Sequence, residues 1–382
     1  MAPHVLVAGV STRAAAESAA RAGFRVTAID AFGDLDQHPL VTARALDRGF
    51  SAYAAAQDAR GIECEAVTYL SSFENHPKAV ATLTRGRTLW GNPPALLRRV
   101  RDPFALSQAL RERGFAVPAV RMNLEPGTAS RESAWLVKPL SSGGGRRVRR
   151  FRPGTRLPRG CYLQEFVEGT PGSIVFAAAG GRSVPLGISR QLVGEHAFGA
   201  TGYQYCGSIL VPPARHGNNT DGDAAGLCAA VAEAFDLTGV NGIDFIGHGG
   251  RAYAVEVNPR WSASMELVEL AYGVSVFSAH AAACARGQLP DFDLSAARRG
   301  ARVTGKAVVF ARQDVTVGDT GAWLASVPAW RDIPRAGEHI AAGRPVCTVF
   351  ASADTVAECH AALVDRARHV YAALAAWDRE VA

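Results

Sequence analysis

The sequence predicts an α/β protein that is built on a parallel β-sheet and holds more than one packed unit. Short apolar runs at 4–10 and 24–29 flank an alanine-rich segment at 13–22, which reads as strand, helix and strand. A start of this kind implies parallel strands. The length of 382 residues exceeds one ordinary domain, and a composition with 48% hydrophobic and 20% charged residues is globular.

Composition argues against several other classes of protein. No apolar run reaches the roughly 20 residues that a membrane span needs, and no basic region precedes the apolar N-terminal stretch. The seven cysteines include no CxxC pair, so we expect neither a disulfide framework nor a zinc ribbon, and a cytoplasmic location fits best. The net charge of +6 comes from dispersed basic residues, so no nucleic-acid or membrane partner is expected.

The N-terminal segment 1–92 is predicted to be a Rossmann-like unit. The GxGxxG fingerprint is absent, so this unit is not expected to bind a dinucleotide. Asp30 closes the second strand, where its carboxylate would either bind a ribose-like diol or cap a turn. Another strand is expected at 67–70, and Gly91-Asn92-Pro93-Pro94 then breaks the chain.

The remaining chain is expected to form a central unit over 93–295 and a small C-terminal α+β unit over 296–382. Strands alternate with glycine turns from about 134 to 260. From about 300 the pattern of elements changes to a strand, turns and a C-terminal helix. The other expected elements are helices near 94–101, 103–113, 265–287 and 353–377 and a strand near 301–311.

A lysine and a glycine loop follow an apolar strand in the segment 134–145. The strand delivers Lys138, and Pro139 leads into a loop that ends in Gly143, Gly144 and Gly145. Glycines let backbone N–H groups approach an anion closely, and a lysine adds a point charge for phosphate oxygens. The segment therefore favours a phosphate clamp, with a β-hairpin turn and a solvated basic face as the alternative.

A second segment, Cys161 to Gly169, reads as a strand that ends in a short linker before glycine. Backbone groups of this linker could face an adenine edge while Phe166 and Val167 supply apolar walls. An ordinary strand end is the alternative, and it is favoured when the segment is read alone.

The most specific pattern is a hairpin at 241–260. If its turn centres on Gly250, Asp244 lies directly across from Glu256, and Asn258 shares their face. Opposed carboxylates are costly unless a cation lies between them, and three hard oxygen ligands suit Mg²⁺. Arg260 follows with the same parity and could neutralise an anion beside the metal. Exposed hairpin residues are the alternative.

Weaker candidates lie between these segments. Ser189-Arg190-Gln191 and His196 precede the glycine- and tyrosine-containing stretch 199–207, which could form part of a substrate pocket. A lone histidine is more often structural, and a surface position is the default for Arg190. No cysteine has an evident base nearby in the sequence, so none is expected to be a nucleophile.

Taken together and in this order, the lysine loop, the linker and the acidic hairpin resemble the ATP-grasp superfamily of carboxylate–amine ligases. The resemblance runs from the N-terminal unit to about residue 290, and Asn258-Pro259-Arg260 is similar to the ending in biotin carboxylase and carbamoyl-phosphate synthase. The segments 332–334 and 343–346 are similar to predicted ATP-dependent carboligases. Such relatives include enzymes that look like tyramine–glutamate ligases of methanopterin- and methanofuran-type cofactor biosynthesis.

The resemblance implies a role for each motif. Lys138 contacts ATP, the loop within about 134–170 forms a lid over the phosphates, and Glu165 and Val167 present backbone groups to adenine. Arg260 and Asn258 are the implied catalytic residues, with Arg260 stabilising the transition state in which an acyl phosphate forms. Asp244, Glu256 and Asn258 hold Mg²⁺ or Mn²⁺, expected as two ions. The full nucleotide-binding set is Lys138, Ser142, Gly143, Gly144, Gly145, Gln164, Glu165, Phe166, Val167 and Glu168.

Three positions depart from the family pattern. Asp102 is followed by Pro103 where a lysine is common, so that contact is lost or passes to Arg101 or Arg99. Gly242 stands where peptide-type ligases often carry an arginine. The acidic ribose contact expected after the linker is missing, which leaves Glu168 as a substitute.

The resemblance implies an ATP-dependent ligase that joins a small carboxylate to an amine through an acyl phosphate. Glutamate ligation in one-carbon cofactor biosynthesis is the narrowest version of this hypothesis. A biotin-carboxylase-like enzyme and a non-catalytic nucleotide-binding regulatory protein are the alternatives. The oligomeric state is open, with a homodimer among the expectations.

Overall fold

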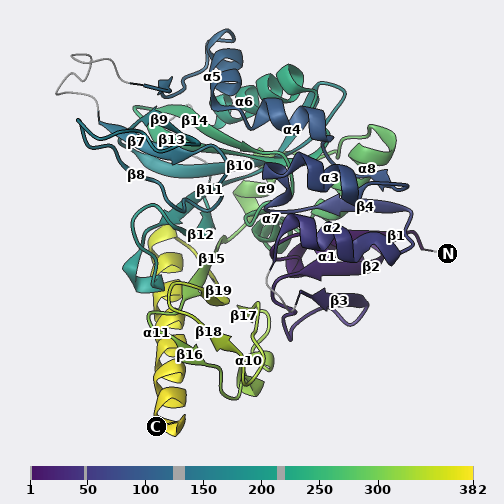
Figure 1. The fold of residues 1–382 in the computed structure, drawn as a ribbon, viewed down its shortest axis with the longest axis vertical. Coiled ribbons are helices and arrows are strands. Elements are labelled where there is room, and N and C mark those ends of the chain that lie inside the picture. Colours follow the sequence, from purple (N-terminus) through teal and green to yellow (C-terminus); the bar gives the residue numbers. More distant parts are fainter. Residues whose placement is uncertain (1, 47–49, 124–133, 213–219, 382) are drawn as a thin grey trace.

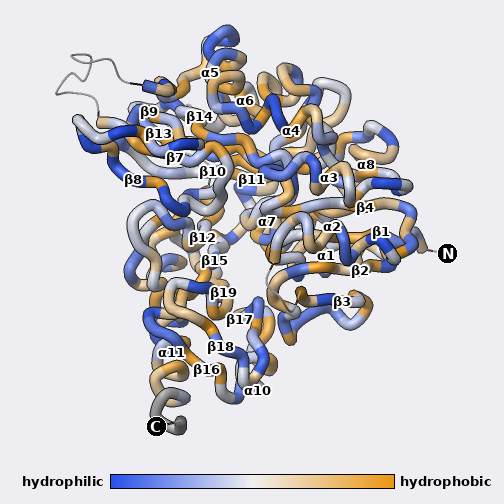
Figure 2. The backbone as a smooth tube through the Cα atoms, in the orientation of Figure 1, coloured by the Kyte–Doolittle hydropathy of each residue, from blue (hydrophilic) through white to orange (hydrophobic). Residues whose placement is uncertain are grey.

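The computed structural model describes residues 2–46, 50–123, 134–212 and 220–381. Three parts of the chain follow one another in space, from the N-terminal sheet through a central region to a C-terminal part flanked by the long helix α11 (Figure 1). Hydrophobic stretches run along the strands of the N-terminal and central sheets, and hydrophilic stretches dominate the periphery (Figure 2).

The N-terminal part is a five-stranded parallel sheet with the strand order β3-β2-β1-β4-β5. The central strand β1 is buried along its whole length, as expected for a parallel sheet covered on both faces. Its strands are β1 (His4–Ala8), β2 (Arg25–Asp30), β3 (Val41–Ala45), β4 (Ala66–Tyr69) and β5 (Thr88–Leu89). Its helices are α1 (Arg13–Arg21), α2 (Ala52–Asp58), α3 (Pro77–Leu83) and the short turns η1 (Ala59–Gly61) and η2 (Phe73–Asn75). The predicted strand–helix–strand start is thereby confirmed.

Asp30 is a turn residue in this structure. Its side chain is buried, and its carboxylate accepts hydrogen bonds from Thr12 Oγ1 (2.7 Å) and from the backbone N–H groups of Phe32 and Gly33. Of the two interpretations of Asp30, the structure therefore favours the turn, because this carboxylate is already occupied by local donors.

A four-stranded sheet, ordered β6-β9-β7-β8, carries the lysine segment. Proline begins both helices that precede it, and Asp102 caps the second through the N–H groups of Phe104 and Ala105. The elements are α4 (Pro94–Val100), α5 (Pro103–Arg111), β6 (Val120–Arg121), β7 (Trp135–Pro139), β8 (Arg149–Arg150) and β9 (Cys161–Glu165).

An eight-stranded sheet, ordered β14-β13-β10-β11-β12-β15-β19-β17, joins the central and C-terminal parts. Its strands are β10 (Thr170–Ala179), β11 (Arg182–Val193), β12 (Tyr205–Leu210), β13 (Gly239–His248), β14 (Arg251–Asn258), β15 (Val303–Phe310), β17 (Trp330–Arg331) and β19 (Pro345–Ala353). Because β12 pairs with β15, the sheet runs across the expected boundary at 295/296. The expected limit at 92/93 leaves the five-stranded sheet whole, whereas the expected limit at 295/296 divides this eight-stranded sheet.

Helices pack on this large sheet, and a small two-stranded sheet lies beside it. The helices of this region are η3 (His196–Phe198), α6 (Thr220–Phe235), α7 (Met265–Tyr272), α8 (Val276–Arg286), α9 (Leu294–Gly300), α10 (Gly321–Leu324) and α11 (Val356–Val381). The two-stranded sheet consists of β16 (Val315–Thr316) and β18 (His339–Ile340). Among the described residues no single helix is long and apolar enough to cross a membrane, whereas α7 and α8, bent by 115°, pass that test as a pair.

Candidate ATP and metal site

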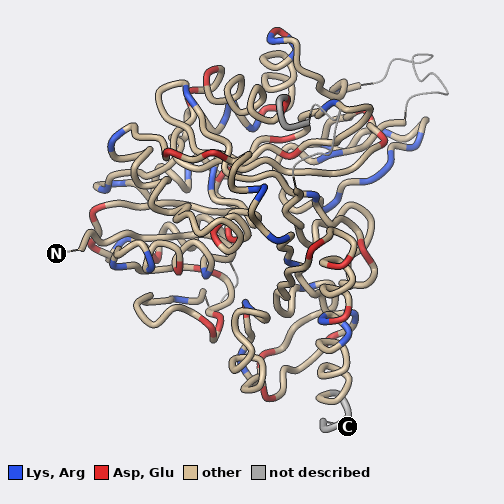
Figure 3. The backbone as a smooth tube through the Cα atoms, turned by 180° about the vertical axis from the view of Figure 1, so that it is seen from behind, with Lys and Arg blue, Asp and Glu red and all other residues tan. Residues whose placement is uncertain are grey.

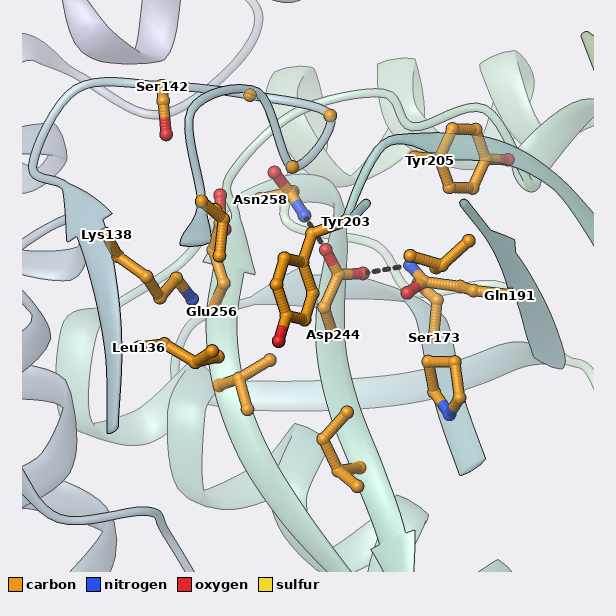
Figure 4. Close-up of a pocket in the computed structure, with 18 of the residues that line it drawn as sticks. Leu136, Lys138, Ser142, Ser173, Gln191, Tyr203, Tyr205, Asp244, Glu256 and Asn258 are labelled. Carbon is orange, nitrogen blue, oxygen red and sulfur yellow. Dashed lines mark hydrogen bonds between the residues drawn. The ribbon is translucent and has the colours of Figure 1, made fainter. Parts of the chain in front are cut away.

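A cavity of about 460 Å³ lies between the four-stranded sheet and the hairpin of β13 and β14 (Figure 4). Its volume is in the range of small-molecule sites. Most of the residues predicted for nucleotide and metal binding line it, namely Lys138, Ser142, Gly143, Gly144, Gly145, Gln164, Glu165, Phe166, Val167, Asp244, Glu256, Asn258 and Arg260. We call this the first cavity. Glu168 is exposed and does not line it.

The hairpin places the two carboxylates opposite each other through a β-bulge. The turn pairs His248 with Arg251, and a regular ladder from there would set Asp244 against Val255. The register shifts between Asp244 and Phe245, so that Asp244 pairs with Glu256. Bulges of this kind re-aim side chains next to functional sites. The predicted pairing is confirmed, and Val255, the extra residue of the bulge, lies in the cavity wall.

A row of polar residues crosses the sheet at this level. Asp244 pairs with Ser173 on the neighbouring strand β10, and Ser173 pairs with Ser189 on β11. From β11, Gln191 Nε2 donates to Asp244 Oδ1 at 2.9 Å, and Asn258 Nδ2 donates to Asp244 Oδ2 at 3.0 Å. Asp244 is thus held in one orientation by donors on two different strands.

Burial and the neighbouring Glu256 raise the pKa of Asp244 to about 6, although hydrogen bonds from Ser173 and Asn258 act in the opposite direction. A carboxylate in this setting carries negative charge that its surroundings compensate only in part. A divalent cation beside it would supply the missing compensation.

Glu256 has the opposite balance. Burial raises its pKa, but the charges of Arg101, Lys138 and Arg260 outweigh burial and hold the pKa below its ordinary value. Arg101 forms an ion pair with Glu256 and also donates to the carbonyl of Val257 at 3.0 Å. Figure 4 shows Lys138 pointing from β7 toward Glu256. This carboxylate is therefore ionised, forms an ion pair with Arg101 and is stabilised by the charge of Lys138.

Arg101 reaches the candidate site from the segment before Asp102 and forms an ion pair there with Glu256. Its second nitrogen donates to Asn75 Oδ1 and to the carbonyl of Ser142, both at 3.2 Å, so it links the hairpin to the start of the glycine loop. Arg99 instead donates to the carbonyl of Ala234, away from the site. Of the two arginines weighed from the sequence, only Arg101 reaches the candidate metal ligands.

Arg260 lies at the end of the hairpin and is positioned by a buried acid. Its guanidinium donates to Glu74 Oε1 at 2.7 Å and to Asn258 Oδ1 at 3.2 Å. Glu74 is only 2% exposed, so this ion pair is shielded from water and fixes Arg260 beside the carboxylates. From this position, Arg260 can stabilise a negative charge that develops beside the two carboxylates.

The glycine loop rests on the stretch 199–207. The N–H of Tyr205 donates to the carbonyl of Gly144 at 3.1 Å, and the positive φ of +71° at Gly145 brings its Cα against the carbonyl of Tyr203. A Cβ at position 145 would lie 1.7 Å from that oxygen, so only glycine fits. The loop is therefore held down over the first cavity, and Tyr203 and Tyr205 become part of its wall.

The linker after β9 keeps only part of its backbone free. The N–H of Glu165 donates to Ala119 O at 2.8 Å and the N–H of Phe166 to Ala134 O at 2.7 Å. Both donors are therefore used, and Val167 N–H is the next donor along the linker toward the cavity. Arg150 stacks on the ring of Phe166 with 3.3 Å between the guanidinium carbon and the ring centre, so this apolar wall is itself held in place.

The sequence analysis missed or underrated several residues that the structure brings to the site. Gln191 was a weak candidate and proves to be a direct partner of Asp244. Ser173 and Glu74 carry no local motif, and they reach the site only through strand order and tertiary contact. His196 and Arg190 do not line the first cavity.

The residues present fit a divalent cation. Asp244, Glu256 and the amide of Asn258 offer hard oxygen atoms, which is the ligand chemistry of Mg²⁺. Among the described residues no three His, Cys, Asp or Glu side chains gather as a metal site, so an ion here would depend on these two carboxylates, the amide and oxygens from outside the protein.

Residues 100–264 match the family model of the ATP-grasp domain. Three solved structures are similar over nearly the whole chain. The L-amino acid ligase from Bacillus licheniformis superposes with a TM-score of 0.68 at 16% identity and covers 95% of this chain and 97% of its own. The biotin carboxylase domain of the 2-oxoglutarate carboxylase from Hydrogenobacter thermophilus, solved with MgADP and bicarbonate, gives 0.69 at 16% identity and covers 93% and 87%.

The third structure is pyruvate carboxylase from Rhizobium etli, with a TM-score of 0.72 and 17% identity over 96% of this chain. This chain spans only 37% of that enzyme's length. No curated protein matches the sequence. Residues 100–264 thus match the ATP-grasp domain, and the chain shares its fold with these structures, which confirms the predicted fold class.

Proposed function

We propose that the protein is an ATP-dependent ligase that joins a small carboxylate to an amine. The observation that carries this proposal is the pairing of Asp244 with Glu256 in a cavity that also holds Lys138 and a glycine loop. The family match over the same residues supports it, as does the likeness to an L-amino acid ligase. ATP and Mg²⁺ are the proposed substrate and cofactor; the number of metal ions is left to experiment.

The reaction would proceed in two steps. An oxygen of the substrate carboxylate attacks the γ-phosphorus of ATP, the bond to the bridging oxygen breaks, and ADP leaves with an acyl phosphate formed. The amine nitrogen then attacks the acyl carbon and loses a proton, and inorganic phosphate leaves with an amide formed. Phosphoryl transfer depends mainly on positioning and charge stabilisation, which is the work that these residues can do.

Each residue has a separate part in this proposal. Lys138 and the N–H groups of the glycine loop bind the phosphates, and the loop excludes water from the acyl phosphate. Arg260, fixed by Glu74, stabilises the charge of the transferred group. Asp244, Glu256 and Asn258 would hold Mg²⁺, which neutralises phosphate charge when it is bound. The Val167 N–H and the side chain of Phe166 would contact adenine.

A carboxylase is the second candidate, because the similar structures include two carboxylases. In that case bicarbonate would accept the phosphoryl group in place of an organic acid. The narrower proposal of glutamate ligation in one-carbon cofactor biosynthesis depends only on the resemblance of the C-terminal segments. A homodimer is likewise a proposal, supported by the description of the Hydrogenobacter domain as a dimer. The free cysteines fit the proposed cytoplasmic location.

A phosphate-release screen tests the proposal. The full chain is incubated with MgATP and pairs of carboxylates and amines, beginning with glutamate and tyramine, and phosphate is measured against single-substrate controls. A ligase releases phosphate when a carboxylate and an amine are both present and forms the amide, which mass spectrometry detects. Bicarbonate-stimulated release without an amine would identify a carboxylase. ATP binding without turnover in any mixture would contradict both and support a regulatory protein.

A further inference from the structure

A second cavity, of about 570 Å³, adjoins the first where the three parts of the chain meet. The two cavities share part of their walls, including the glycine loop, Tyr205 and Arg260. Seen from behind, acidic and basic segments lie next to one another in this central region (Figure 3). A molecule in the second cavity would therefore reach the group that Arg260 stabilises in the first.

Most charged side chains around the second cavity already have partners. Arg13, which is 1% exposed, donates to Asp332 Oδ1 and Glu266 Oε1, both at 2.6 Å, and to Glu17 Oε2 at 3.1 Å. Lys306 donates to Glu266 Oε2 at 2.8 Å. These two cations lie among carboxylates from distant parts of the sequence and leave little for a ligand to satisfy.

Among the acidic residues that line this cavity, Asp34 has a buried oxygen atom without a partner in the described part of the chain. It is 6% exposed, and its buried Oδ2 atom has no hydrogen-bond partner among the described residues. Burial and the charges of Asp332 and Asp30 raise its pKa well above the ordinary value, and the charge of Arg13 offsets this only in part. A buried acceptor without a donor is costly, so this atom calls for an N–H group from outside the protein.

The charge balance around Asp34 points the same way. Apart from Asp34, the buried network has three cationic side chains and four carboxylates: Arg13, Lys306 and Arg331 against Glu17, Asp36, Glu266 and Asp332. The excess is negative on the Asp34 side, whereas Arg146, Arg260 and Arg344 supply positive charge elsewhere on the cavity wall. The described residues offer no cluster of three metal-binding side chains, which favours an organic cation over a metal ion.

We propose that the second cavity binds a substrate with a positively charged amino group, that Asp34 accepts a hydrogen bond from this group, and that the reacting end of the substrate lies toward Arg260. The inference rests on the proposed ligase function and adds that one of the two substrates carries an ammonium group away from its reacting end. An ammonium group matches the site because it brings both the missing donor and the missing positive charge.

Matched pairs of compounds test the proposal by binding alone. The probes are β-alanine against propionate, 4-aminobutyrate against butyrate, and L-glutamate against glutarate. Calorimetric titration of the full chain is carried out with and without a non-hydrolysable ATP analogue and Mg²⁺. We expect at least one amino compound to bind tenfold or more tightly than its counterpart. The proposal is overturned if no amino compound in the panel shows this preference under either condition.

Variants at Asp34 locate the preference. Asp34→Asn should weaken binding of the preferred amino compound at least tenfold, whereas Asp34→Glu should keep part of the preference because it keeps the charge. Asp314→Asn, an exposed aspartate that accepts a hydrogen bond from Ala342 N–H, is the control for loss of one negative charge. An unchanged dissociation constant in Asp34→Asn would overturn the assignment.

Melting temperatures separate a ligand-binding role from a structural one. Asp34→Asn should unfold at the same or a higher temperature than the parent, because it removes a buried carboxyl group whose Oδ2 has no hydrogen-bond partner within the described residues. Asp36→Asn should unfold at a lower temperature, because Asp36 is paired with Arg331 at 3.1 Å and accepts from Ile333 N–H. The affinity of the parent protein for the ATP analogue tests the proposed ligase function separately. If the parent binds the amino compound but not the ATP analogue, only the proposed ligase function is contradicted.

Discussion

Two carboxylates that face each other carry opposite electrostatic settings in this protein. Arg101, Lys138 and Arg260 surround Glu256 and keep it ionised, whereas Asp244 is surrounded mainly by neutral donors and has a raised pKa. A cation would interact most favourably on the Asp244 side. At the scale of single residues, the site is therefore asymmetric before any ligand arrives.

Replacing Glu256 by glutamine tests its assignment as a metal ligand. Glu256→Gln should lower kcat about 100-fold or more and raise the Mg²⁺ concentration needed for half-maximal rate, because a charged oxygen ligand is lost. Phosphate release at varied Mg²⁺ measures both effects. Glu233→Gln is the control, since that side chain is 70% exposed and remote from the cavity. An unaltered Mg²⁺ dependence in Glu256→Gln would contradict the assignment.

The single-residue features differ in how well the sequence predicted them. The pairing of Asp244 with Glu256 follows from a turn near Gly250, since the ribbon brings local residues together. The pairing also needs the bulge at Val255, which the local sequence did not reveal. A turn assumed to centre on Gly250 nevertheless predicted the right partner, because this assumption shifts the pairing by the one residue that the bulge adds. Arg101 was one of two arginines left open, and only its contact with Glu256 decides between them.

The glycine loop shows how an element is specified by one position more than by its composition. Gly143 has no neighbour that a Cβ would meet and no positive φ, whereas Gly145 has both a positive φ and the carbonyl of Tyr203 in contact. The run of three glycines is therefore not uniform. Sequence alone predicted the loop, but not that its third glycine is the one packed against another segment.

Alanine at each position separates the two roles. Gly145→Ala should raise KM for MgATP about tenfold or more, because the loop must leave its place on Tyr203 and the alanine is strained at positive φ. Gly143→Ala should raise it at least fivefold less. Steady-state kinetics and cooperative unfolding of both variants check the comparison. Equal effects of the two substitutions would show that packing on Tyr203 has no part in ATP binding.

At the scale of the whole molecule, His280 joins the N-terminal sheet to the central sheet. The N–H of Val240 donates to His280 Nδ1 at 3.0 Å, and His280 Nε2 lies 3.2 Å from Thr68 Oγ1 and 3.3 Å from the carbonyl of Trp90. These contacts need a neutral ring, with Nδ1 as acceptor. Burial lowers the pKa of His280 to about 4, although the bond to Trp90 acts in the opposite direction.

The stability of the molecule should consequently depend on this histidine in weak acid. Below about pH 6.5 the unfolded chain binds a proton at this position that the folded protein refuses until about pH 4. The free energy of unfolding is therefore highest above pH 6.5 and falls as the pH drops toward 4. The loss is about 3 kcal/mol, because the pKa is about 6.5 in the unfolded chain and about 4 in the folded protein. Urea unfolding between pH 7 and 4 measures this loss.

His280→Gln should be less stable than the parent at pH 7 and should lack this part of the pH dependence. His369→Gln, with a side chain 67% exposed, is the matched control and should follow the parent curve. Parallel curves for the parent and His280→Gln would show that the neutral ring is not required.

The sequence predicted the N-terminal strand–helix–strand unit, the first helices and the hairpin, because each depends on residues close in the chain. Long-range arrangement was not available to it. Gln191 reaches Asp244 only because β10 and β13 are neighbours, and Asp34 lines the second cavity only because the C-terminal part packs beside the N-terminal sheet. Nothing in the local pattern around either residue indicates this.

The pairing of β12 with β15 makes the C-terminal part a structural support of the site. Gly207, Ser208 and Ile209 pair with strand β15, and Tyr205 at the start of the same strand borders both cavities. In a protein that is truncated at the expected boundary near 295, β12 would become an edge strand with unpaired backbone N–H and C=O groups. Such edges recruit other chains. The segment that matches the ATP-grasp domain is consequently not a unit that can be cut out of this chain with its fold intact.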